Sequence, residues 1–209
     1  MNLLLFGNSN ALKIIEAIAY APNNEISNNE EFELHKGRFI DTKERMYTWL
    51  QVTNDGGVFK IASNHGEGFK MNLDRFGDLE SFNNKQSHCF FWLSCFNWLI
   101  EDEHSNFDYK DTIRYYIEEI VSVFGKSNIH IVYPAPVYRV TANPKLNANY
   151  NKLCGVLEEL CKEYNIPTPE LYLNKDIYND PDNYSDGSHL LSNFYRDIWT
   201  NIKSKAAQN

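Results

Sequence analysis

Three polar residues at the two ends of this chain are of the types that perform acyl chemistry. Ser9 lies in Gly7-Asn8-Ser9-Asn10, directly after an apolar run. Asp186 and His189 stand three positions apart near the other end, before an amphipathic stretch. A serine hydroxyl is a weak nucleophile until an imidazole accepts its proton, and a carboxylate can hold that imidazole in the required tautomer. If the fold brings the two ends together, these residues predict a serine hydrolase or acyltransferase.

Each of these motifs also has a purely structural explanation. Gly-Asn-Ser after a strand is common turn chemistry. Asp186 or Ser188 could instead cap the last helix. The catalytic interpretation is favoured because a serine after the first strand, an asparagine (Asn97) after a later strand and the Asp-x-x-His before the last helix occur together, in the order of one architecture.

The elements that must position these residues alternate between strands and helices. Strands are expected at 2–6, 47–52, 58–62, 89–93 and 129–133, where short apolar or β-branched runs end in turn residues. Helices are expected at about 11–21, 113–124, 146–164 and 190–202, where apolar residues recur every three or four positions. The Asn- and Glu-rich stretch 23–36 and the polar stretch 63–68 are expected to be loops.

This alternation predicts an α/β fold with a mainly parallel central sheet and helices on both faces. In such folds the ligand site lies at the carboxyl ends of the strands. Ser9, the 63–68 stretch and Asn97 all follow expected strands, so they are predicted to meet at one edge of the sheet. The turn residues 54–57 predict a hairpin between the strands on either side.

Length and composition agree with a single domain that spans residues 1–209. Hydrophobic residues make up 43% of the 209 residues, which is enough for a substantial core. The 20 basic and 28 acidic residues give a net charge of -8, which disfavours a surface that follows phosphates. Nucleic acid is therefore not an expected partner.

The chain start and the cysteines predict a cytoplasmic protein. No basic segment or cleavage site accompanies the first apolar run, and no run of about 18 apolar residues predicts a membrane span. Cys154 and Cys161 on one helix would be roughly 10 Å apart, and Cys89 and Cys95 along one strand about 20 Å apart, too far for either pair to form a disulfide. Reduced cysteines are expected.

The chain resembles the SGNH (GDSL-like) hydrolases, a three-layer α/β/α fold in which four short blocks build one site. Gly7-Asn8-Ser9 matches the first block, with Ser9 as the nucleophile. Asp186-Gly187-Ser188-His189 matches the last block. Cys95-Phe96-Asn97-Trp98 resembles the block with the side-chain oxyanion donor, which would be Asn97. For the glycine that supplies a backbone oxyanion donor, Gly66 is the choice, with Gly68 close behind.

The sequence departs from the family pattern at several positions. Asn8 replaces an Asp, Cys95 a Gly and Trp98 an Asp, and the region 23–60 looks like an insertion. The four candidate side chains are all retained. The resemblance implies an esterase or acyl hydrolase, and the departures fit a divergent branch that acts on O-acyl groups, such as acetyl, of a carbohydrate. Two alternatives stay open, a sugar O-acyltransferase with the same triad and a catalytically weak binding protein.

No cofactor or metal is predicted. The spacing of His35, His88 and His104 does not match a metal-ligand pattern. His65 is expected in a solvated loop, and His130, which alternates with isoleucines, is expected to be a structural histidine. The expected partner is a small-molecule or carbohydrate ester, with an acyl donor in the case of transfer. The sequence indicates no oligomeric state.

Overall fold

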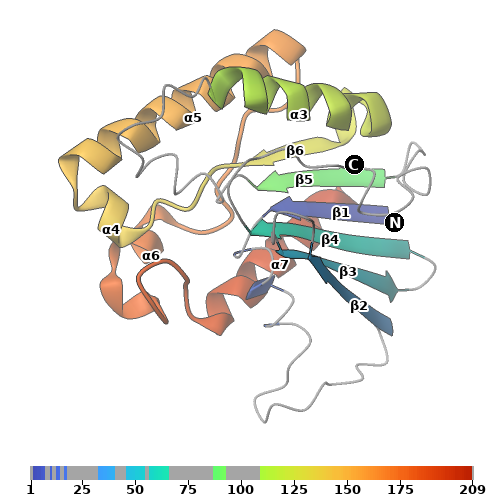
Figure 1. Ribbon diagram of the computed structural model, residues 1–209, viewed down its shortest axis with the longest axis horizontal. Helices are drawn as coiled ribbons and strands as arrows, with labels where there is room; N and C mark the ends of the chain where they lie inside the picture. Colours follow the sequence, from blue (N-terminus) through green and yellow to red (C-terminus); the bar gives the residue numbers. More distant parts are fainter. Residues whose placement is uncertain are drawn as a thin grey trace.

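A six-stranded sheet with the order β2-β3-β4-β1-β5-β6 runs through the protein (Figure 1). The computed structural model of the chain describes residues 2–7, 10, 13–14, 17, 33–40, 46–54, 57–65, 87–92 and 109–208. The strands are β1 (Asn2–Gly7), β2 (Glu33–Ile40), β3 (Met46–Asn54), β4 (Gly57–His65), β5 (Ser87–Trp92) and β6 (Ile129–Val132).

The centre of the sheet is parallel. β1 lies between β4 and β5 and runs parallel to both, and β6 continues the parallel arrangement beyond β5. A parallel bridge between Val132 and Glu170 extends this edge by a short additional segment. The predicted α/β class with a mainly parallel sheet is confirmed.

The other edge of the sheet is antiparallel. β3 and β4 form the hairpin that the turn residues predict, with Asn54 opposite Gly57. β2 pairs with β3 along its whole length, from Glu33 opposite Thr53 to Ile40 opposite Met46. The expectation of a loop over 23–36 is therefore wrong for its last four residues, which lie in β2. The polar loop expected at 63–68 is likewise wrong for residues 63–65, because β4 continues through His65.

The long helices occur where the apolar spacing predicts them. They are α3 (Tyr109–Phe124), α5 (Pro144–Tyr164) and α7 (Ser192–Ala207). Short helical turns connect them: α4 (Tyr138–Thr141), α6 (Lys175–Asn179) and the 3-10 turns η4 (Lys126–Asn128) and η5 (Pro181–Asn183). Residues 10, 13, 14 and 17 are helical as well, in agreement with the helix predicted after β1.

Local signals set the ends of these helices. The side chain of Asn143 accepts hydrogen bonds from the amides of Lys145 and Leu146 and so caps the start of α5. α3 ends before Gly125, whose φ of 73° lies in the region that favours glycine. Among the described helices, none is long and apolar enough to cross a membrane.

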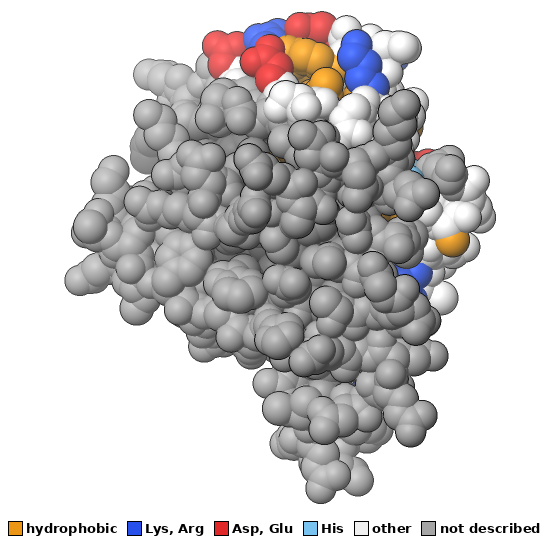
Figure 2. Space-filling view, turned by 90° about the vertical axis from the view of Figure 1, so that its right-hand side faces the viewer, with side chains coloured by type: hydrophobic (Ala, Val, Ile, Leu, Met, Phe, Trp, Pro, Cys, Tyr) orange, Lys and Arg blue, Asp and Glu red, His pale blue; other side chains and the backbone are white. Residues whose placement is uncertain are grey.

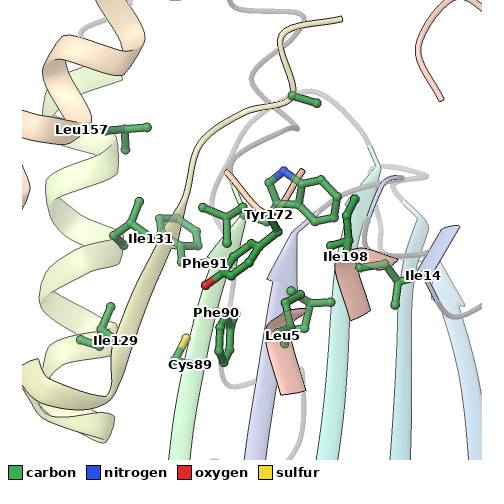
Figure 3. Close-up of a cluster of buried hydrophobic side chains, with 14 of the residues drawn as sticks. Leu5, Ile14, Cys89, Phe90, Phe91, Ile129, Ile131, Leu157, Tyr172 and Ile198 are labelled. Carbon is green, nitrogen blue, oxygen red and sulfur yellow. The ribbon is translucent and has the colours of Figure 1, made fainter. Parts of the chain in front are cut away.

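Helices cover both faces of the sheet and bury its central strands. The described side chains of β5 and β6 are all buried. Figure 3 shows Ile129 and Ile131 on the side of Leu157 from α5, whereas Leu5 lies on the side of Ile14 and Ile198 from α7. Helices on the two faces with the sheet between them form three layers, as predicted.

Ion pairs join the exposed surfaces of α3 and α5. Lys110 pairs with Glu159 at 2.7 Å, and Arg114 pairs with both Asp111 and Glu163. Figure 2 shows red and blue side chains together at the top of the molecule, the region of α3 and α5 in Figure 1. Exposed pairs of this kind contribute little to stability, so the buried faces of the two helices hold this layer in place.

The register of the sheet defines where a site can form. Gly7 at the end of β1 pairs with Ser63 near the end of β4, and Phe6 pairs with Phe91 near the end of β5. The carboxyl ends of these three strands therefore lie at the same edge. From β1 the chain first builds one side of the sheet and then crosses to β5 on the other side, which makes this edge the topological switch point.

Candidate active site

Asp186 and His189 form a carboxylate–imidazole pair. Nδ1 of His189 lies 2.8 Å from Oδ2 and 3.0 Å from Oδ1 of Asp186. An ionised carboxylate only accepts hydrogen bonds, so Nδ1 carries the hydrogen and Nε2 of the neutral ring keeps a lone pair. This tautomer is the one that a general base of a serine hydrolase uses.

A tight turn holds this pair. Oδ1 of Asp186 accepts hydrogen bonds from the backbone amides of Ser188 at 2.8 Å and His189 at 2.9 Å. The amide of Ser185 donates to the carbonyl of His189, and Tyr184 forms an antiparallel bridge with Leu190. These backbone hydrogen bonds hold the histidine close to the carboxylate.

The alternative that this motif caps the last helix is not supported. α7 begins at Ser192, and its N-cap residue Leu191 makes no side-chain capping hydrogen bond. Asp186 uses its oxygens within its own turn and on the imidazole. The Asp-x-x-His motif thus builds the pair itself.

Asp186 stays ionised in this turn. Partial burial opposes ionisation of the carboxyl, but the hydrogen bonds from the His189 ring and from the amides of Ser188 and His189 outweigh it and lower the pKa of Asp186. An ionised carboxylate beside Nδ1 stabilises an imidazolium, the form that a general base reaches after it accepts a proton.

The second ring nitrogen of His189 has no partner among the described residues. The side chain of His189 is 19% exposed, yet its Nε2 atom is buried and makes no hydrogen bond in the part of the chain that the structure describes. A buried acceptor without a partner costs free energy. A proton donor such as a nucleophile hydroxyl would satisfy this atom.

A single tyrosine links this histidine loop to the beginning of the chain. The hydroxyl of Tyr195 in α7 donates a hydrogen bond to Oδ1 of Asn10 and accepts one from the amide of Leu190 at 3.2 Å. Asn10 directly follows Ser9, and Leu190 directly follows His189. The two ends of the chain are thus brought together at Asn10 and Leu190, each the next residue after a predicted catalytic residue.

The remaining predicted site residues lie outside the described residues. Ser9, Gly66 and Asn97 are among them, as are Gly68 and Trp98. The strands that precede the first two are described: β1 ends at Gly7, two positions before Ser9, and β4 ends at His65, immediately before Gly66. These strand ends lie at one edge of the sheet, as the sequence predicts.

Two solved structures share this architecture. The crystal structure of an acetyl xylan esterase, AlAXEase, has a TM-score of 0.58 and 13% identity, over 98% of this chain and 99% of that one. The crystal structure of the lipase/acylhydrolase from Enterococcus faecalis has a TM-score of 0.57 and 15% identity, over 100% of this chain and 96% of that one. No protein-family model and no curated protein matches the sequence.

This chain shares the fold of these two structures, in agreement with the predicted SGNH-like architecture. The agreement extends over nearly the full length of both structures, which is the extent that the four short blocks predict. Within this SGNH-like fold, the unusual region 23–60 contributes β2 and β3, two antiparallel strands that extend the sheet beyond β4.

Asn10 and Tyr195 are absent from the residues that the sequence singles out. Asn10 reads as one more polar residue of a turn, although it is 2% exposed. Tyr195 lies beside the expected apolar stripe of the last helix, and the structure buries it to 1% exposure while Phe194 of that stripe is only partly buried. Tyr195 precedes Ile198 by three positions and Ile202 by seven, the spacing of one helix face, and this spacing is the signal that the sequence offers.

The other two histidines with described side chains, His88 and His130, form a buried pair. His130 is buried on β6, where it stacks on Phe90 with ring centroids 4.3 Å apart. Its Nε2 lies 3.2 Å from Nδ1 of His88. The prediction that His130 is a structural histidine is confirmed by this buried pair.

Proposed function

We propose that this protein is a serine esterase of the SGNH type, with Ser9 as nucleophile, His189 as general base and Asp186 as the residue that orients His189. The observation that carries the proposal is the Asp186–His189 pair, with its buried Nε2 atom and its link through Tyr195 to the neighbour of Ser9. The similarity to an acetyl xylan esterase and to a lipase/acylhydrolase supports acyl-ester chemistry.

The first half of the reaction acylates the serine. Nε2 of His189 accepts the proton of the Ser9 hydroxyl as Oγ bonds to the ester carbonyl carbon, and the carbonyl oxygen becomes an oxyanion. The backbone amides of Ser9 and Gly66 and the side-chain amide of Asn97 are the proposed donors to that oxyanion. The intermediate collapses when the C–O bond to the alcohol breaks, and His189 returns the proton to the leaving oxygen.

The second half releases the acyl group. His189 takes a proton from water, the resulting oxygen attacks the acyl-serine, and the bond from Ser9 Oγ to the acyl carbon breaks. Oγ receives the proton from His189, which restores the starting state. Asp186 remains ionised throughout and stabilises the imidazolium in each half.

We propose O-acetyl groups of a carbohydrate as the substrate class. The structural similarity to an acetyl xylan esterase supports this assignment. An acetyl group needs only a small acyl pocket.

Covalent labelling tests the proposal directly. The pure protein is treated with a fluorophosphonate probe, and the modified peptide is identified by mass spectrometry. We expect one label, on Ser9, and none in Ser9→Ala. Ser204→Ala, which changes an exposed serine of α7, is the matched control and should label at the parental rate.

Substrate class is tested in the same preparation. Release of acetate from acetylated xylo-oligosaccharides should exceed release of fatty acid from long-chain esters, and Ser9→Ala should abolish both. Full labelling of Ser9→Ala, or hydrolysis that persists in it, would contradict the esterase proposal.

A further inference from the structure

Tyr195 occupies a position between the two halves of the site that the proposed chemistry does not use. Its hydroxyl donates to Oδ1 of Asn10 and accepts from the amide of Leu190. These two partners are 180 positions apart in the chain (190 minus 10), and each directly follows a proposed catalytic residue. The phenol oxygen therefore connects the residue after Ser9 with the residue after His189.

The surroundings of Tyr195 shield this connection from water. The side chain is 1% exposed, and burial raises the pKa of its hydroxyl, which therefore stays protonated and able to donate. Asn10 is 2% exposed and Leu190 is 4% exposed, so water does not compete for these hydrogen bonds from bulk solvent. Hydrogen bonds in such a buried setting are costly to leave unmade.

A second contact fixes the helix that carries Tyr195. Nε of Arg196 donates to the carbonyl of Ala17 at 2.9 Å. Ala17 is helical, as is Asn10. The backbone of α7 is thus docked independently of the phenol, so loss of the hydroxyl alone should leave the helix in place.

We propose that Tyr195 is a positioning residue that sets the alignment of Ser9 with Nε2 of His189, an inference that rests on the proposed triad. Because the hydroxyl of Tyr195 binds the residue after each of these two catalytic residues, its removal should let Asn10 and Leu190 move relative to one another. A misplacement of about 1 Å between nucleophile and base can cost roughly 100-fold in rate. The loss should fall on kcat, since Tyr195 lies in the core and not in a substrate cleft.

The test is Tyr195→Phe, compared with two control variants. Tyr150→Phe removes another buried phenol, which donates to the carbonyl of Pro134 at 3.1 Å. Arg196→Gln removes the hydrogen bond from Arg196 of α7 to the carbonyl of Ala17. We expect Tyr195→Phe to lower kcat for an acetyl ester and the rate of fluorophosphonate labelling by roughly 10- to 100-fold, with KM within about twofold. Both controls should stay within about threefold of the parental kcat.

Hydrogen exchange of the same variants tests the link through Tyr195 separately from the proposed function. Tyr195→Phe should speed amide exchange both around Asn10 and in 185–190, whereas Tyr150→Phe should change neither segment. If Ser9 is labelled in the parental protein and Tyr195→Phe is labelled at the same rate, the positioning role is overturned. If the parental protein does not label at Ser9, the triad fails, and unchanged exchange in either segment then overturns the link itself.

Discussion

The imidazole of His189 donates Nδ1–H to the carboxylate of Asp186, which simultaneously accepts two backbone amides of the same turn. The three hydrogen bonds tie the side chain of Asp186 to the backbone that carries His189. The carboxylate is therefore both a structural anchor of the turn and the electrostatic partner of the ring. Substitutions can separate these two roles.

Asp186→Asn should retain much of the hydrogen bonding of the turn and lose most of the catalytic activity. The Asn oxygen can still accept the amides of Ser188 and His189, but the neutral side chain no longer stabilises an imidazolium. We expect kcat to fall about 1,000-fold, and His189→Ala to cost at least as much. Steady-state rates on an acetyl ester measure both.

The double variant Asp186→Ala/His189→Ala tests whether the two residues act as a unit. Residues that function through one another give losses that do not add. Its rate should equal that of His189→Ala within about threefold. Losses that multiply would show that Asp186 acts on something other than His189.

Asn97→Ala should slow acylation with little effect on substrate affinity. An oxyanion donor acts mainly in the transition state, so its loss should lower the acylation rate by roughly 100- to 1,000-fold. Pre-steady-state acylation measures this rate. If Asn97→Ala acylates at the parental rate and has the parental Tm, Asn97 is not part of the site. If its Tm is lowered, Asn97 has a structural role.

The sequence predicts those parts of the fold that local patterns control. β5 is predictable because Cys89 to Trp92 is a continuous apolar run that is buried on both faces of the sheet. α5 is predictable from apolar residues at steps of three and four, among them the buried Leu153, Leu157 and Leu160. The Asp186–His189 pair is equally local, because one turn contains the hydrogen bonds that the structure describes for Asp186.

What the sequence does not predict depends on distant pairing. β2 begins in an Asn- and Glu-rich stretch without clear alternation, and its hydrogen bonds come from β3, a partner that its own residues do not specify. The hydrogen bond from Tyr195 to Asn10 joins residues 185 positions apart and depends on how α7 packs on the sheet. Neither residue type nor spacing reveals such a contact.

Leu157→Ala should destabilise the layer formed by α3 and α5. Leu157 is 0% exposed and lies beside Ile131 (Figure 3). Truncation leaves a cavity and should cost about 3 kcal/mol, or roughly 10 °C in Tm. Asn151→Ala, which changes an exposed residue of α5, is the control and should keep the parental Tm. Equal melting of both variants would show that α5 does not depend on this buried face.

The buried His88–His130 pair should make the stability of the fold depend on pH. Burial, followed by the charges of His88 and Lys205, lowers the pKa of His130 to about 4, and burial also lowers the pKa of His88. Because an unfolded histidine titrates near pH 6.5, the folded state binds fewer protons than the unfolded state between these values. The contribution to stability is fully present above about pH 6.5 and is lost as the pH falls towards 4.

His130→Gln isolates this effect from the titration of carboxylates. The free energy of unfolding is measured with urea at several values between pH 7.5 and 4 for the parental protein and the variant. The parental stability should fall more steeply, by up to about 1.4 kcal/mol per pH unit, and the accumulated difference should reach about 3 kcal/mol by pH 4. Parallel curves would mean that His130 binds protons equally in the folded and unfolded states, in contradiction to its burial against Phe90 and His88.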